Sequence, residues 1–160
     1  MRAVVQRVLK GSVSAEGETV GSIGEGLAVL LGISRDDDHT DSDYVIRKLL
    51  TLKLFGENDK RWQKSAKEAG HELLIISQFT LCHTFKGTKP DFHQSMGADQ
   101  SKPFFEEFIE RLKKEYAADK IQTGKFGSHM EIDLKLDGPV TLVIDSPAKQ
   151  QKNPKPDESK

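Results

Sequence analysis

Residues 135–145 read KLDGPVTLVID, and they place a Gly-Pro pair at the start of an apolar strand. Val140, Leu142 and Ile144 follow at every second position, which is the spacing of a β-strand with one buried face. Glycine adopts backbone angles that other residues avoid, and proline cannot donate a hydrogen bond to a sheet. The Gly138-Pro139 pair therefore predicts either a tight turn or a backbone segment that serves a pocket.

The rest of the chain predicts a mixed order of strands and two main helices, without a regular βα repeat. Alternating or continuous apolar runs favour strands at residues 2–15, 19–23, 26–33, 53–57, 71–81, 124–136 and 140–145. Apolar residues at helical spacing favour helices at 41–51 and 103–116, the second with Pro103 in its first turn. Residues 83–100 are expected to form a long loop, and loops of that length are often functional.

Size and composition indicate one mixed α/β domain over residues 1–146 and a polar, disordered tail over 147–160. The net charge is −1, so overall charge does not indicate nucleic-acid binding, and any such contact needs a local basic patch. The only cysteine is Cys82, which excludes an intrachain disulfide and favours a reducing compartment. No stretch is long enough to span a membrane, and no targeting signal stands out, so we expect a cytoplasmic protein.

Polar residues close the apolar run at 71–81, in the order Ser77, Gln78, Phe79 and Thr80. Polar groups that interrupt a buried strand need partners, so these side chains either bond neighbouring backbone or belong to a site. A Ser or Thr nucleophile needs a general base within reach, and no His or Lys near Thr80 fills that role. The spacing alone therefore identifies no catalytic triad.

Other candidate sites have simpler explanations. Cys82 and His83 are neighbours in an expected strand and would point to opposite faces, so a thiol–imidazole pair is not favoured. The histidines at 71, 83, 93 and 129 lack the close spacing of metal ligands, and we expect neither a metal nor another cofactor. The glycine-rich stretch 21–26 leads into a strand, which does not support a phosphate-binding loop. Lys86 and Lys89 could meet phosphates, although two lysines also suit a solvated loop.

Five segments, in the order in which they occur, resemble the D-aminoacyl-tRNA deacylase family, first described as D-tyrosyl-tRNA deacylases. They are MRAVVQRV at 1–8, LLIISQFTL at 73–81, KGTKPDFH at 86–93, GKFG at 124–127 and DGPVT at 137–141. The resemblance covers nearly the whole chain, and the segments between are similar to the eukaryotic branch. It implies a homodimer with a barrel-like β core and flanking helices. It also implies hydrolysis of the ester between a D-amino acid, or mischarged glycine, and the 3′ end of tRNA.

The resemblance also implies a site shared between subunits. Ser77, Gln78 and Thr80 correspond to the catalytic segment, and Phe79 lies among them on the pocket floor. The Gly138–Pro139 bond is expected to be cis and to close the partner's pocket, so that its carbonyl oxygens exclude an L side chain. Arg7 is expected to bond these carbonyls. Lys86 and Lys89 are candidate tRNA contacts.

Several alternatives remain open at this stage. Thr80 could act as a nucleophile, or the side chains could position the ester while the terminal 2′-hydroxyl of the tRNA activates water; the absence of a base favours the second mechanism. Leu136 stands where the family usually has Asn, and packing on its strand would explain it. The alternative functions are a non-catalytic nucleic-acid-binding protein on the same scaffold and a thiol hydrolase built on Cys82.

Overall fold

The computed structural model describes residues 1–149, so most of the predicted tail at 147–160 lies outside the described residues. The strands are β1 (Arg2–Ala15), β2 (Glu18–Ile23), β3 (Gly26–Gly32), β4 (Phe55–Glu57), β5 (Lys60–Lys64), β6 (Glu72–Ser77), β7 (Thr84–Lys86), β8 (Lys89–Asp91), β9 (Ile121–Thr123) and β10 (Glu131–Asp145). The α-helices are α1 (His39–Thr51), α2 (Ala66–Ala69) and α3 (Ala98–Glu115), and short 3-10 helices are η1 (Phe79–Cys82) and η2 (Ala118–Lys120).

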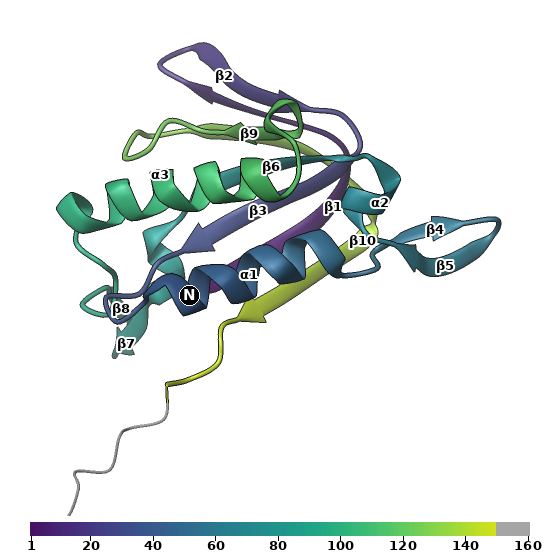
Figure 1. Ribbon diagram of the computed structural model, residues 1–160. Coiled ribbons are helices and arrows are strands. Elements are labelled where there is room, and N and C mark those ends of the chain that lie inside the picture. Colours follow the sequence, from purple (N-terminus) through teal and green to yellow (C-terminus); the bar gives the residue numbers. More distant parts are fainter. Residues whose placement is uncertain (150–160) are drawn as a thin grey trace, which may run out of the picture.

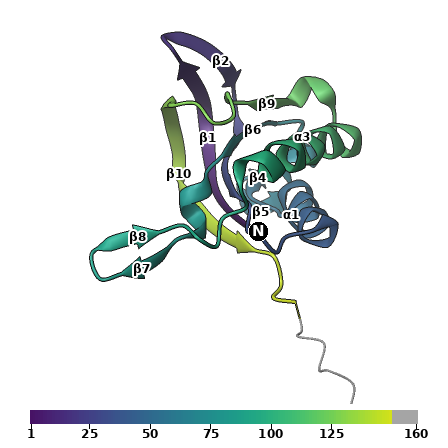
Figure 2. The same ribbon diagram turned by 90° about the vertical axis from the view of Figure 1, so that its left-hand side faces the viewer.

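One curved sheet forms the centre of the molecule, in the order β10-β1-β3-β6-β9 with β2 also paired to β1. β1 runs antiparallel to β10, β2 and β3, whereas β3–β6 and β6–β9 are parallel. β2 curls over to contact β6 and β9, so the sheet is nearly closed, and α1 and α3 cover its outer side (Figures 1 and 2). The expected mixed α/β class, with a barrel-like core and two main flanking helices, is confirmed.

The central strands are buried on both faces, as their continuous apolar sequences predict. Ile75 of β6 packs into the core beneath the helices, together with Val29 and Phe108. Its neighbour Ile76 points the other way, into a second core inside the curved sheet that also contains Val8. Successive residues of a strand face opposite sides, so an unbroken apolar run is what two cores require.

The two main helices begin earlier than the apolar spacing predicts. Asp38 caps α1 by a reciprocal capping box with Asp41, which satisfies backbone N–H groups at the helix start. α3 begins after Gly97, and the amide of Ser101 donates to the carbonyl oxygen of Gly97 at 2.8 Å. Pro103 therefore lies inside the helix, and its predicted place in the first turn was wrong. The N-terminal extension of α3 lacks apolar periodicity, which is why the sequence pattern missed it.

β10 is a single 15-residue strand, whereas the sequence indicated two strands divided by a turn. Its pairing with β1 shifts register on both sides of Val8, opposite the cis Gly138–Pro139 bond. The irregularity bends the strand without ending it. Leu136 is 43% exposed, so packing within this chain does not explain it.

The segment expected to be a strand end and a long loop is also more ordered than predicted. β6 stops at Ser77, and η1 turns the chain so that residues 79–82 are not extended. β7 and β8 then form a hairpin that projects away from the helices (Figure 2).

Close backbone contact between β3 and β6 makes Gly26 intolerant of a side chain. A Cβ atom at Gly26 would lie 1.8 Å from the carbonyl oxygen of Glu72, a distance that backbone cannot relieve cheaply. We expect Gly26→Ala to lower the free energy of unfolding by about 2 kcal/mol or more, measured by urea denaturation. Gly24→Ala is the matched control, because its Cβ would meet only the side-chain end of Glu72 at 3.4 Å. Equal stability of the two variants would contradict this account.

Candidate functional site

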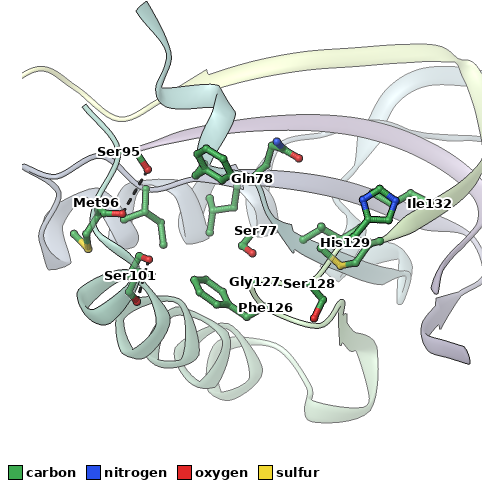
Figure 3. A pocket seen from close by; sticks show the side chains of 16 residues that line it. Ser77, Gln78, Ser95, Met96, Ser101, Phe126, Gly127, Ser128, His129 and Ile132 are labelled. Carbon is green, nitrogen blue, oxygen red and sulfur yellow. Dashed lines mark hydrogen bonds between the residues drawn. The ribbon is translucent and has the colours of Figure 1, made fainter. Parts of the chain in front are cut away.

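A pocket of about 660 Å³ lies where β3 and β6 end, between η1, the start of α3 and the segment 126–132. Its walls are mainly apolar and aromatic, with a few polar side chains (Figure 3). The residues lining it are Leu31, Ile33, Ile76, Ser77, Gln78, Phe79, Ser95, Met96, Ala98, Ser101, Phe126, Gly127, Ser128, His129, Met130 and Ile132. A cavity of this size and composition is typical of a small-molecule site.

The end of β6 supplies the polar floor of the pocket. Gln78 is fixed by its backbone amide, which donates to the carbonyl oxygen of Leu31 at 2.8 Å. Ser77 and Phe126 both line the cavity, and they lie near each other in the view of Figure 3. The chain turns into η1 directly after Gln78, so the pocket receives successive side chains that a continuing strand would send to opposite faces.

Thr80 contacts the pocket indirectly. Its Oγ1 accepts a hydrogen bond from the side-chain amide of Gln78, and Thr80 is not among the lining residues. Within residues 1–149, the only side chain that hydrogen-bonds this hydroxyl is Gln78, and an amide is not a base. The geometry therefore gives Thr80 a partner that orients it but none that would activate it as a nucleophile.

Cys82 and His83 do not form a thiol–imidazole pair, although the reason differs from the one based on an extended strand. Cys82 ends η1 and is half-buried against Gly32, and burial raises the pKa of its thiol. His83 Nδ1 lies 2.8 Å from the carbonyl oxygen of Thr80. A protonated thiol and an imidazole engaged with backbone do not provide a nucleophile and its base.

The Gly138–Pro139 segment lies on β10 and is exposed, and neither residue lines this chain's own pocket. Arg7 holds the segment from β1: its Nε is 3.3 Å from the carbonyl oxygen and 3.1 Å from a carboxylate oxygen of Asp137. Its Nη1 donates to the carbonyl oxygen of Leu54 at 2.7 Å. Arg7 thus bonds the carbonyl of Asp137, one residue before the two carbonyls that we expected.

Lys86 and Lys89 face each other across the β7–β8 hairpin and are both exposed. Lys86 lies 3.2 Å from Asp91, which also bonds His93. Hydrogen bonds from His93 and Lys86 hold the pKa of the Asp91 carboxyl well below its usual range. Lys89 makes no ion pair within residues 1–149, which leaves its charge available to a ligand.

The described residues contain neither a metal-binding cluster nor a membrane-spanning helix. Among residues 1–149, no three His, Cys, Asp or Glu side chains are grouped so that they could hold a metal ion. No helix in that range is long and apolar enough to cross a membrane.

Comparison with known proteins gives the family. A family model described as D-Tyr-tRNA(Tyr) deacylase matches residues 4–145. The chain belongs to the D-Tyr-tRNA(Tyr) deacylase family. The resemblance found in the sequence is thereby confirmed, and so is the expectation of an ester hydrolase.

Individual deacylases are similar over almost the whole chain. D-aminoacyl-tRNA deacylase 1 of Leishmania major is 51% identical over 148 residues, covering 91% of this chain and 97% of that protein. Its human counterpart is 45% identical over 149 residues, covering 92% of this chain and 71% of that protein. The solved structure of "c-Myc DNA Unwinding Element Binding Protein" superposes with a TM-score of 0.89 at 44% identity, covering 92% of this chain and all of that one.

Sequence reasoning missed the wall of the deacylase pocket that residues 126–129 form. His129 was placed among scattered surface histidines, yet it lines the pocket together with Phe126 and Ser128. The GKFG segment carried part of the family resemblance, but its role was not apparent. The available signal was the pair of glycines at 124 and 127, since glycines often mark a tight turn that can present its neighbours to a cavity, and Gly127 does adopt φ +75°.

The buried thiol yields a prediction about pH. Because burial raises the pKa of Cys82, we expect alkylation by iodoacetamide to titrate at higher pH in the folded deacylase than in the protein unfolded in urea. Cys82 is the only cysteine, so mass spectrometry of the modified protein measures this one site. An alkylation midpoint in the folded protein at or below that of the unfolded chain would show a reactive thiolate.

Proposed function

We propose that this protein hydrolyses the ester between a D-amino acid and the 3′-terminal adenosine of tRNA, and so removes D-amino acids before translation uses them. The observation that carries the proposal is the 51% identity to a D-aminoacyl-tRNA deacylase across 91% of the chain. The family model matches residues 4–145, which include the pocket and all of its polar residues. The protein acts in the cytoplasm under this proposal, as the sequence predicts.

The pocket suits the terminal nucleoside of tRNA and its aminoacyl group. Its volume of about 660 Å³ is sufficient for a ligand of that size. Aromatic walls such as Phe79 and Phe126 offer faces on which a base can stack, and Ser77 and Gln78 offer hydrogen bonds near the ester.

The chemistry is attack of water on the ester carbonyl. The carbon–oxygen bond to the ribose breaks, the ribose oxygen takes a proton, and the free D-amino acid leaves. Ser77, Gln78 and Thr80 position the ester, and the Gln78 amide or backbone N–H groups stabilise the developing oxyanion. The terminal 2′-hydroxyl of the tRNA assists the attacking water, because none of residues 1–149 supplies Thr80 with a base that would make it a nucleophile.

Chiral selection is assigned to the Gly138–Pro139 segment of a partner subunit. The segment is exposed, held rigidly by Arg7 and outside its own pocket, which is the arrangement that a second copy could use. Its backbone occupies the position of an L side chain and leaves a D side chain free. Because exclusion acts on the side chain, mischarged glycine, which has none, is hydrolysed as well.

A homodimer also explains the uncovered surface of β10. β10 is an edge strand of 15 residues, and long exposed edges invite pairing with another chain. It exposes four apolar side chains: Ile132, Leu136, Leu142 and Val143. Leu136, which nothing in this chain packs against fully, is accounted for if it is buried between two copies.

The test is a paired hydrolysis assay with D-Tyr-tRNA and L-Tyr-tRNA, using wild type and Thr80→Ala. We expect wild type to cleave the D ester and spare the L ester. We expect kcat of Thr80→Ala to remain within about tenfold of wild type, because loss of a covalent nucleophile costs far more, roughly a millionfold in the best-studied hydrolase.

Each outcome separates the alternatives. A millionfold loss in Thr80→Ala with an unchanged melting temperature would make Thr80 the nucleophile. Failure of folded, dimeric wild type to cleave either ester would overturn the hydrolase proposal. A non-catalytic nucleic-acid-binding protein would then be favoured, since the similar solved structure is described as a DNA unwinding element binding protein.

The dimer is tested at Val143, which is 60% exposed on β10. We expect Val143→Lys to shift the protein to monomer in sedimentation velocity and to abolish deacylation, because each pocket then loses the partner's Gly138–Pro139 segment. Val20→Lys is the matched control, since Val20 is also an exposed valine on a strand, at 40%. A monomeric Val143→Lys that still discriminates D from L esters would contradict the shared site.

A further inference from the structure

The β4–β5 hairpin and the residues beside it carry an excess of basic side chains in a chain that is slightly acidic overall. The hairpin itself, residues 55–64, holds three basic and two acidic side chains, hence a local charge of +1, and Lys53, Lys67 and Glu68 flank it. The hairpin extends outward past the end of α1 and α2, away from the sheet (Figure 1). Such a concentration of positive charge on a projecting element attracts polyanions.

Two of the three basic residues in the hairpin have no acidic partner within the described residues. Lys64 pairs with Glu57 at 2.7 Å, and Lys53 pairs with Glu68 at 3.0 Å. Lys60 and Arg61 are exposed and make no ion pair within the described part of the chain. The unpaired basic residues of the hairpin are therefore neighbours at the start of β5, and the unpaired Asp59 offsets one of their two charges within the described residues.

The aromatic side chain of Trp62 follows Lys60 and Arg61 directly in the sequence. Trp62 is 51% exposed, although tryptophan is usually buried, and its backbone has φ +59°. A left-handed angle at a bulky residue costs of order 1–3 kcal/mol and indicates a constraint beyond folding. It coincides with a register shift between β4 and β5, a bulge that redirects the side chain. Lys60, Arg61 and Trp62 together combine the charges and the flat face that single-stranded nucleic acid binds.

The hairpin is tied to the Gly138–Pro139 segment by one guanidinium. Arg7 donates to Leu54, the residue immediately before β4, and to Asp137, the residue immediately before Gly138. The proposed function sends the Gly138–Pro139 segment into the partner's pocket. In that arrangement the hairpin of one subunit stands beside the pocket of the other.

We propose that the β4–β5 hairpin of one subunit binds the RNA strand of the aminoacyl-tRNA whose ester lies in the partner's pocket. Lys60 and Arg61 contact its phosphates, and Trp62 stacks on a base or ribose. The inference rests on the proposed function and adds to it a binding surface for the substrate outside the pocket. It also explains how a chain of net charge −1 can capture tRNA, because only a few phosphates need to be met.

The experiment compares two substrates, full-length D-Tyr-tRNA and 3′-O-(D-tyrosyl)adenosine, which fills the pocket but has no RNA strand. For Lys60→Gln/Arg61→Gln we expect KM for the tRNA to rise about tenfold and the slope of log KM against log[KCl] to fall by about 2. Hydrolysis of the adenosine ester stays unchanged. Trp62→Ala also raises KM for the tRNA only, and Trp62→Phe restores part of it.

The matched control is Lys113→Gln/Lys114→Gln, which removes the same charge from the last turn of α3. An equal rise in KM for the tRNA in this control would show that the effect comes from the overall charge of the protein, and it would overturn the proposal. Unchanged kinetics of the hairpin variants on both substrates would also overturn it. The exposed ring of Trp62 would then be assigned to a contact with a protein instead of RNA. Failure of the proposed function is distinguishable, because wild type would then cleave neither substrate.

Discussion

Pairing of β1 along both of its edges is the constraint on which the rest of the structure depends. Its first half bonds β3 on one side and β10 on the other, and its second half bonds β2 and β10. A strand that serves three neighbours must bend, and the register shifts around Val8 are where it does so. The bend nearly closes the sheet, separates the two cores and brings the chain's most distant segments together.

The same bend places Arg7 at the centre of the functional architecture. From β1 its guanidinium reaches the backbone before β4 and the backbone before the Gly138–Pro139 segment. Five N–H donors in a rigid fork let one side chain fix two segments that are more than 80 residues apart in sequence. The proposed selectivity segment and the proposed RNA-binding hairpin are therefore both anchored at their starts by the same side chain of β1.

The pocket performs its proposed task with hydrogen bonds and shape, because the described residues offer no conventional nucleophile with a base. The side-chain amide of Gln78 donates a hydrogen bond to the Thr80 hydroxyl, and an amide is not a base. Burial raises the pKa of the Cys82 thiol, which disfavours the thiolate. Residues 1–149 contain no metal-binding cluster. Positioning a reactive ester, which already carries a neighbouring 2′-hydroxyl, demands less of the protein than cleaving an unactivated bond. Apolar walls and a few fixed polar groups are sufficient for a protein that positions the ester while the substrate supplies the reactive groups.

The strands of the double core can be predicted from the sequence, because short continuous apolar runs such as 26–33 and the one within 71–81 favour strands buried on both faces. The sequence also determined the family and the segments of the site, through LLIISQFTL and DGPVT. Only the tertiary structure decided that Gly138 and Pro139 lie within one continuous strand, that His129 and Phe126 complete the pocket, and that Trp62 stands exposed beside unpaired charges. Local patterns report which faces of an element are apolar, whereas the partners across a cavity or a bent sheet are set by contacts between residues far apart in the chain.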